Sequence, residues 1–216
     1  MPSHFLVDEE IDTLTPKQIW LNGLKRLKTW RFWRNLAVYF CVFSVVGHCL
    51  EYVYCMFNSY FFGIVDPNSG VWNSPFYPYF VYGFGVVVVA VVMVPYRAML
   101  IRWRLSDVKA CLHFFTVGIL AAMAMELAQG FIQNQPDEFG NYPLWDNSHL
   151  PGNILGQAWI VNDILISLIM TFFAWVAYPL CERGFAKLSD KAANILAAIV
   201  IVGTVVLTVY MYGTYG

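Results

Sequence analysis

The chain has 216 residues, of which 59% are hydrophobic and only 12% are charged. A soluble domain carries roughly twice that charged fraction, so the composition excludes a water-soluble protein. The net charge of -1 gives no basic field for nucleic acid. The sequence also contains neither a Gly-rich phosphate-binding motif nor a paired CxxC metal site.

Five stretches of mostly apolar residues each have the length of about 20 residues that a helix needs to cross a membrane. We therefore predict an all-α, polytopic membrane helix bundle that forms a single transmembrane domain over residues 36–216. Pro95 is expected to close the second span, because proline interrupts a helix. The predicted spans cover residues 36–57, 76–95, 110–131, 158–180 and 192–212.

The positions of the basic residues predict the orientation of these spans. All 13 Lys and Arg residues fall before the first span, between the second and third, or between the fourth and fifth. These segments lie on the same side of an alternating topology. By the positive-inside rule, the N-terminus is cytoplasmic, the chain crosses the membrane five times and the C-terminus is outside.

Residues 1–35 are predicted to be a cytoplasmic segment with a basic interfacial helix. Thr15-Pro16 is a good helix start, and apolar residues follow it at helical spacing opposite lysines. Such a helix is either an anchor attracted to anionic lipid or a docking site for a cytoplasmic partner. The apolar positions are Trp20, Leu24, Leu27 and Trp30, and the basic ones are Lys17, Lys25 and Lys28.

Three acidic residues lie inside the predicted spans. Glu51 follows Arg34 by 17 residues and Glu126 follows Lys109 by 17 residues, which places both glutamates at one depth and suggests that spans one-two and three-four are parallel repeats. Asp163 lies near the same level in the fourth span. No Lys or Arg lies on that side, so the acids either share protons or bind a cation. The alternative is that protonated, hydrogen-bonded acids only hold the helices together.

The two predicted outer loops, residues 58–75 and 132–157, contain no Lys or Arg and are dense in Pro, Gly, Asn and aromatic residues. Together with the acids, their residues are candidates to line an outward-facing cavity. Carboxylates ringed by aromatic side chains suit an organic cation or a polar aromatic solute, although an interfacial aromatic belt gives a similar pattern. The candidate lining residues are Trp72, Asn73, Tyr82, Trp145, Asp146 and Asn153.

No cofactor is expected from the histidines and cysteines. His48 lies one helical turn before Glu51, where it either relays a proton or is a packed core residue. His48 and His113 lie at different depths, which makes a poor pair of haem ligands. The five cysteines have no metal-ligand spacing, and the fifth span, apolar apart from Thr204 and Thr208, is expected to be a peripheral anchor.

The order of several short motifs resembles a known family. These motifs are Gly47-x3-Glu51, Asn73-Ser74-Pro75-Phe76-Tyr77-Pro78 leading to Tyr82-Gly83-Phe84-Gly85, Glu126 with Gly130, and Trp145-Asp146-Asn147-Ser148 with Pro151, Asn153 and Gly156. Over spans one to four they are similar to the bacterial CmpB-like permease family, also called ABC-transporter type IV. The chain departs from the family pattern at Ser74, at Asn147 and at Gln157, where the family often has a basic residue.

The resemblance implies a multi-pass protein of the bacterial inner membrane that takes part in transport. The 216 residues have no Walker motif, so we expect no catalytic activity in this chain alone and a separate ATPase subunit on the basic cytoplasmic face. Five spans also suggest a homo-oligomer or a heteromeric complex. The leading hypothesis is a permease-like component whose outer cavity binds a small polar or cationic solute.

Two other functions remain open from the sequence. One is a membrane enzyme acting on a lipid-linked envelope precursor, with a glutamate as base and His48 or His149 nearby. The other is a non-catalytic assembly subunit of a larger membrane complex, in which the acids hold helices together and the loops dock other subunits.

Overall fold

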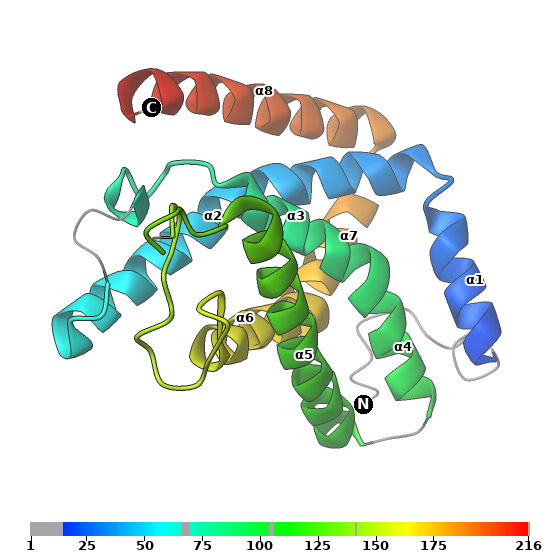
Figure 1. Cartoon of the computed structure of the whole chain (residues 1–216). Coiled ribbons are helices and arrows are strands. Elements are labelled where there is room, and N and C mark those ends of the chain that lie inside the picture. Colours follow the sequence, from blue (N-terminus) through cyan, green and yellow to red (C-terminus); the bar gives the residue numbers. More distant parts are fainter. Residues whose placement is uncertain (1–14, 66–69, 104–105, 141, 216) are drawn as a thin grey trace.

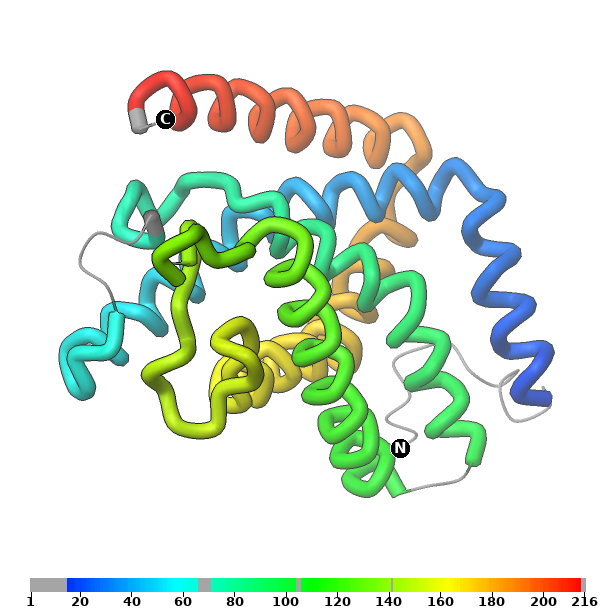
Figure 2. The backbone as a smooth tube through the Cα atoms, viewed as in Figure 1, coloured from blue at the N-terminus to red at the C-terminus, as the bar shows by residue number. Residues whose placement is uncertain are grey.

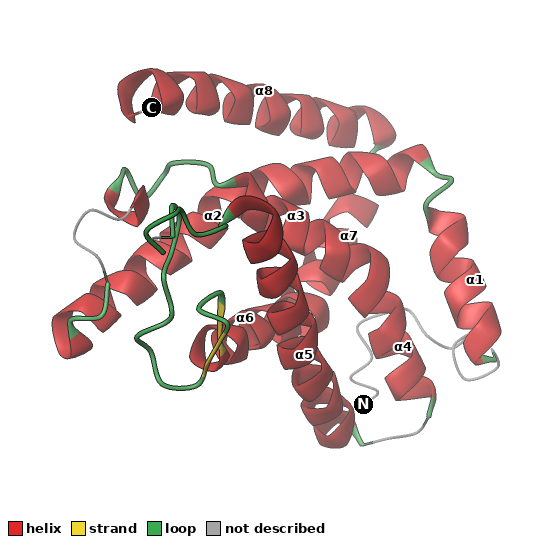
Figure 3. Cartoon of the chain, viewed as in Figure 1, coloured by secondary structure: helices red, strands yellow, loops and turns green. Residues whose placement is uncertain are grey.

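The computed structural model describes residues 15–65, 70–103, 106–140 and 142–215. Almost all secondary structure in this part of the chain is helical (Figure 3). Five helical stretches in it are long and apolar enough to cross a membrane, which confirms the predicted all-α bundle. Residues 1–14 of the predicted cytoplasmic segment and Arg104 lie outside the described residues. The stretches are Trp30–Phe62, Phe80–Arg102, Asp107–Gln133, Ile160–Ala186 and Asp190–Thr214.

The first helix, α1 (Pro16–Arg26), starts at the predicted position. Thr15 and Gln18 form a reciprocal capping box, in which each side chain accepts a hydrogen bond from the other residue's backbone N–H. Trp30 was expected on this helix, but that prediction is wrong. The Thr29 side chain accepts a hydrogen bond from the backbone N–H of Phe32 and caps a new helix that begins at Trp30. Helix α1 therefore ends before Trp30.

Two helical hairpins form the bundle. Helix α2 (Trp30–Phe62) packs along α3 (Phe80–Val88), and α5 (Asp107–Gln133) packs along α6 (Ile160–Phe172) (Figure 1). Each hairpin has one close approach between a glycine and a serine: Gly83 touches Ser44, and Gly118 touches Ser167. A Cβ atom at either glycine would collide with the serine Oγ. Small residues therefore set the spacing of both hairpins, as is common between membrane helices.

Both returning spans pass through a π-helical turn. Helix α3 continues through η3 (Val89–Met93) into α4 (Val94–Arg102), and α6 continues through η4 (Phe173–Ala177) into α7 (Tyr178–Ala186). Pro95 and Pro179 follow these turns by two residues. The wider π turn accommodates the missing proline N–H. The prediction that Pro95 closes the second span is therefore wrong, because the helix continues to Arg102.

The two π turns pack against each other in the buried centre of the bundle, where Ala90 and Ala174 are both fully buried. In η4 the Tyr178 N–H bonds the carbonyl of Phe173, five residues back. The equivalent donor for the Ala174 carbonyl would be Pro179, which has no N–H. The fully buried Arg97 supplies that donor instead: its Nη1 lies 3.1 Å from the Ala174 oxygen.

The guanidinium of Arg97 also lies 4.7 Å from the ring centroid of Trp175, a cation–π contact. Arg97 therefore joins the two halves of the bundle. The sequence alone places it in a cytoplasmic loop, because Pro95 there indicates the end of the span.

Matching features of the two hairpins support the predicted parallel repeat. The π turns start at Val89 and at Phe173, 84 residues apart, and Pro95 and Pro179 have the same separation. The glycine–serine contacts have the same separation: Gly83 of the first hairpin and Ser167 of the second, each on the returning span, are also 84 residues apart. The repeat thus covers packing contacts as well as the two glutamates.

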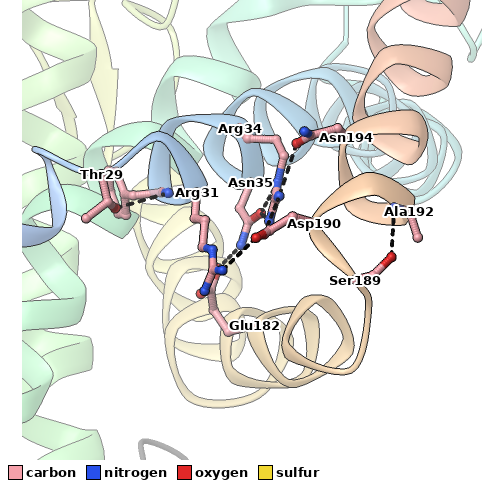
Figure 4. A network of polar contacts seen from close by, with 10 residues as sticks. Thr29, Arg31, Arg34, Asn35, Glu182, Ser189, Asp190, Ala192 and Asn194 are labelled. Carbon is pink, nitrogen blue, oxygen red and sulfur yellow. Dashed lines mark hydrogen bonds and ion pairs between the residues drawn. The ribbon is translucent and has the colours of Figure 1, made fainter.

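Helix α8 (Asp190–Tyr215) lies along α2 at the edge of the bundle (Figure 2). Most of its described side chains are exposed, which agrees with the expected peripheral position. At one end Arg31 Nη2 contacts Asp190 Oδ2 at 2.6 Å (Figure 4). At the other end the rings of Tyr77 and Tyr212 lie 4.9 Å apart. The remaining helix, α1, packs on α4 through Ile19, which is buried against Ala98.

Candidate functional site

Two acidic side chains face each other between α5 and α6. Asp163 is fully buried and Glu126 is half-buried. Their carboxyl groups are within hydrogen-bonding reach of each other, and neither oxygen of Asp163 receives a hydrogen bond from an N–H or O–H of the described residues. Two ionised carboxylates have no proton to donate. The contact therefore needs either a shared proton or a cation between them.

The start of α6 gives this acidic pair its electrostatic setting. A short antiparallel hairpin, β1 (Asn153–Ile154) and β2 (Ala158–Trp159), leads into the helix. Trp159, the N-cap residue, donates its backbone N–H to Glu126 Oε2 at 3.2 Å. Asp163 belongs to the first turn of α6, where the helix dipole is positive. Helix α6 thus supplies positive potential on the side of the membrane that carries no Lys or Arg.

Polar side chains connect the pair to the other hairpin. The Asn162 side chain lies beside the Glu126 carboxyl, and its Oδ1 accepts a hydrogen bond from the Tyr54 hydroxyl at 3.0 Å. Tyr54 comes from α2. The sequence analysis missed both residues, although Asn162 adjoins Asp163 and Tyr54 lies on the same helix face as Glu51, three residues later.

Glu51 is held separately from the other two acids. Its carboxyl lies close to the Tyr82 hydroxyl, and the Tyr82 ring packs directly over Gly47. Tyr82 is the third residue of α3, just as Asn162 is the third residue of α6. Each glutamate therefore lies near the first turn of the helix that follows it, beside a phenol in one hairpin and an amide in the other.

The predicted site residues of the second loop hold the loop itself together. The Trp145 indole N–H donates to the Gln157 carbonyl at 2.8 Å, and the Asn153 amide donates to the Leu150 carbonyl at 2.8 Å. Asp146 is exposed and its Oδ1 accepts the Ser148 N–H at 2.8 Å. Hydrogen bonds from Ser148 lower the pKa of the Asp146 carboxyl below its ordinary value.

A buried amide pair lies under this loop. Asn134 Nδ2 donates to Gln157 Oε1 at 2.9 Å, and Gln157 Nε2 donates to the Asn134 carbonyl at 2.8 Å. Gly130 packs against the Gln157 side chain with no room for a Cβ. Gln157 occupies the position where the resemblance implies a basic residue, so a neutral amide joins the end of α5 to the loop here.

The remaining predicted residues lie around the other outer loop. Trp72, at the end of the short helix η2 (Gly70–Trp72), packs edge-on against Tyr52 with ring centroids 5.6 Å apart, and the adjacent Asn73 is half-buried. His48 is fully buried, with its Nδ1 2.9 Å from the Tyr77 carbonyl oxygen. His149 is exposed. Among the described residues no group of three or more His, Cys, Asp or Glu side chains could hold a metal ion.

The five long apolar helices of the described residues define a polytopic membrane protein. The family described as putative ABC-transporter type IV matches residues 38–212, which is more than half of the chain. The chain belongs to this family, as the sequence motifs had suggested. No curated protein and no solved structure matches the chain.

Proposed function

We propose that this chain is the membrane-embedded subunit of a transporter and that it binds a small cationic solute at the Glu126–Asp163 pair. The observation that carries the proposal is the contact between these two carboxyl groups, one of them fully buried and without a donor among the described residues. A buried acid with no partner is costly in a membrane. A solute ammonium or guanidinium group would donate to both carboxylates and replace the shared proton.

The surroundings of the pair favour an organic cation. Tyr54 and Asn162 provide a hydroxyl and an amide that orient polar groups of a solute, and the half-buried Trp145 and Tyr82 belong to the same outer end of the bundle. Aromatic faces attract desolvated cations. In this proposal Glu51 and Tyr82 form a second polar position along the path of the solute.

Energy for transport would come from a separate subunit. The family is named for ABC transporters, yet the 216 residues contain no Walker motif. We propose that an ATPase docks on the basic end of the bundle, where α1 packs on α4 and leaves Leu21 and Leu24 exposed. A homo-oligomer or a heteromeric complex would complete the translocation path.

The proposal is tested by measuring how organic cations shift the melting temperature of the purified protein, with choline, putrescine and guanidinium chloride as probes. Wild type should be stabilised by at least one of them. Glu126→Gln or Asp163→Asn removes one carboxylate of a charge-assisted hydrogen bond that contributes about 1.5–3 kcal/mol. Either substitution should weaken binding roughly 10- to 100-fold.

Glu138→Gln is the matched control, because it removes an exposed carboxylate from the same outer loop and should leave binding unchanged. Equal stabilisation of wild type and of the Glu126→Gln/Asp163→Asn double variant would refute the solute site. A different result would favour the assembly-subunit alternative: the Glu126 and Asp163 substitutions have no effect, whereas changes in the loop of residues 132–157 release partner subunits. The internal hydrogen bonds of that loop are also compatible with a docking surface.

A further inference from the structure

The contact between Glu126 and Asp163 needs an occupant when no solute is bound. Two carboxyl groups are too few for a metal ion such as Ca²⁺, which takes roughly 6–8 oxygen ligands, and no third His, Cys, Asp or Glu of the described residues completes a metal site. The backbone N–H of Trp159 lies 3.2 Å from Glu126 Oε2, and an N–H donor is not a metal ligand. A shared proton is therefore the occupant that fits the pair.

The surroundings supply no fixed positive charge that could replace this proton. No ion pair of the described residues includes Glu126 or Asp163. The loop that joins α5 to α6 carries its described charged side chains at exposed positions. The charge of the pair is therefore set by its own protons or by a bound cation. The titratable side chains nearest to it on other elements are Glu51, Tyr54 and Cys55 of α2 and Tyr82 of α3, and those of the loop are Asp137, Glu138, Asp146 and His149.

Binding of a monovalent cation changes the number of protons on the pair. With one shared proton, the empty pair carries one negative charge. A cation that contacts both carboxyl groups needs both of them ionised, because a protonated carboxyl is neutral. The O–H bond then breaks, the proton passes to the solution, and the cation takes its place between the two carboxylates. The site keeps one negative charge, so the exchange adds no charge to a buried environment.

The packing around the pair leaves the loop end of the bundle as the exit for the proton. Glu126 is half-buried, whereas Asp163 is fully buried. One and two turns further along α6, the hydroxyls of Ser167 and Thr171 each donate to a backbone carbonyl. These hydroxyl protons are already used, and the fully buried Ala174 fills the centre beyond them. The pair therefore exchanges protons through Glu126, on the side of the loop.

We propose that the acidic pair releases one proton for each monovalent organic cation that it binds, so that the proton is a second ligand of this site. The inference rests on the solute site proposed above and adds competition between solute and proton. Uptake of a proton and release of the solute are then one step. A pH difference between the two sides of the membrane would thus drive the solute off the pair on the acidic side.

The first test counts the released protons. Guanidinium chloride, at concentrations too low to unfold the protein, is added to purified protein in a weakly buffered solution with a pH indicator dye, and sodium chloride serves as the blank. Wild type and Glu138→Gln, which changes an exposed carboxylate of the loop, should release up to one proton per bound cation. Glu126→Gln places an amide N–H beside Asp163 instead of the shared proton. Residual binding in this variant should release none.

The second test follows the affinity for guanidinium against pH, from the shift in melting temperature at each pH. On the acid side of neutrality the affinity of wild type should fall about tenfold per pH unit, the slope of a one-proton exchange. Tyr54→Phe removes the nearby phenol and should weaken binding but keep this slope. Binding that is independent of pH and releases no proton would overturn the exchange and leave the solute site in place. Absence of binding at every pH would overturn both.

Discussion

At the scale of single residues, close contacts of glycine set the geometry on which the acidic pair depends. Gly118 of α5 touches Ser167 of α6. Along the helices, Gly118 lies about two turns from Glu126, and Ser167 lies about one turn from Asp163. The Ser167 hydroxyl in turn donates to the Phe115 carbonyl at 2.6 Å. Because both acids lie on these two helices, the distance between the helix axes decides whether the carboxyl groups meet.

Gly118→Ala is expected to destabilise the protein. The added methyl group would collide with Ser167 Oγ, and overpacking of this kind costs about 1–3 kcal/mol. The melting temperature of the purified protein in detergent should therefore fall. The double variant Gly118→Ala/Ser167→Ala should recover most of the loss, since the clashing hydroxyl is then absent.

Gly85→Ala provides the control for helix propensity. A Cβ at Gly85 meets no atom within 4 Å, and alanine is the better helix former by about 0.8–1 kcal/mol. This variant should be neutral or stabilising. If the Gly118→Ala protein has the same melting temperature as wild type, the two helices of the hairpin can move apart without loss of stability, which would contradict the prediction.

At the scale of elements, the π turns explain why the sequence is misleading around Pro95. A proline in an apolar run normally indicates a helix end, and the predicted second span stops there for that reason. The structure instead widens the preceding turn and continues the helix, and Arg97 then satisfies the Ala174 carbonyl across the bundle. The sequence held one usable signal, the 84-residue separation of Pro95 and Pro179.

Arg97→Met is expected to destabilise the junction of the two hairpins. Methionine keeps an unbranched apolar stem but leaves the buried Ala174 carbonyl without its donor. An unsatisfied buried carbonyl costs about 1–3 kcal/mol, and loss of the cation–π contact with Trp175 adds to it. Denaturation followed by circular dichroism should report the loss.

The role of Arg97 is separated from a general charge effect by two comparisons. Lys187→Met removes an exposed cation and should change stability little. Pro179→Ala restores an N–H five residues after Ala174, so Arg97→Met should cost less in that background. An equal cost in both backgrounds would show that Arg97 stabilises the protein by some other contact.

At the scale of the whole molecule, the sequence predicted the number of spans, but not which acids meet. Hydropathy alone located the five helices, because each must cover a hydrocarbon core of similar thickness. The depth arithmetic placed Asp163 level with Glu126, and the structure brings these two together. The rotation of each helix about its axis depends on packing, which is why Glu51 faces Tyr82 instead.

The orientation of the bundle is the prediction on which the proposed ATPase docking site depends. The structure gathers basic residues of α2 beside the start of α8 at one end of the molecule, which the positive-inside rule makes cytoplasmic. Single cysteines in a background without the five native ones test this orientation. The chosen positions, Asp146→Cys, Lys187→Cys and Lys25→Cys, are all exposed.

In intact cells a membrane-impermeant maleimide should label the cysteine at 146 but not those at 187 and 25, which should react only after permeabilisation. Exposed thiols react readily, whereas thiols buried in apolar surroundings do not, so the three exposed positions can be compared directly. Labelling of the cysteine at 25 or 187 from outside would show that the bundle has the opposite orientation in the membrane. The acidic pair would then face the cytoplasm, and a cytoplasmic ATPase could not reach α1.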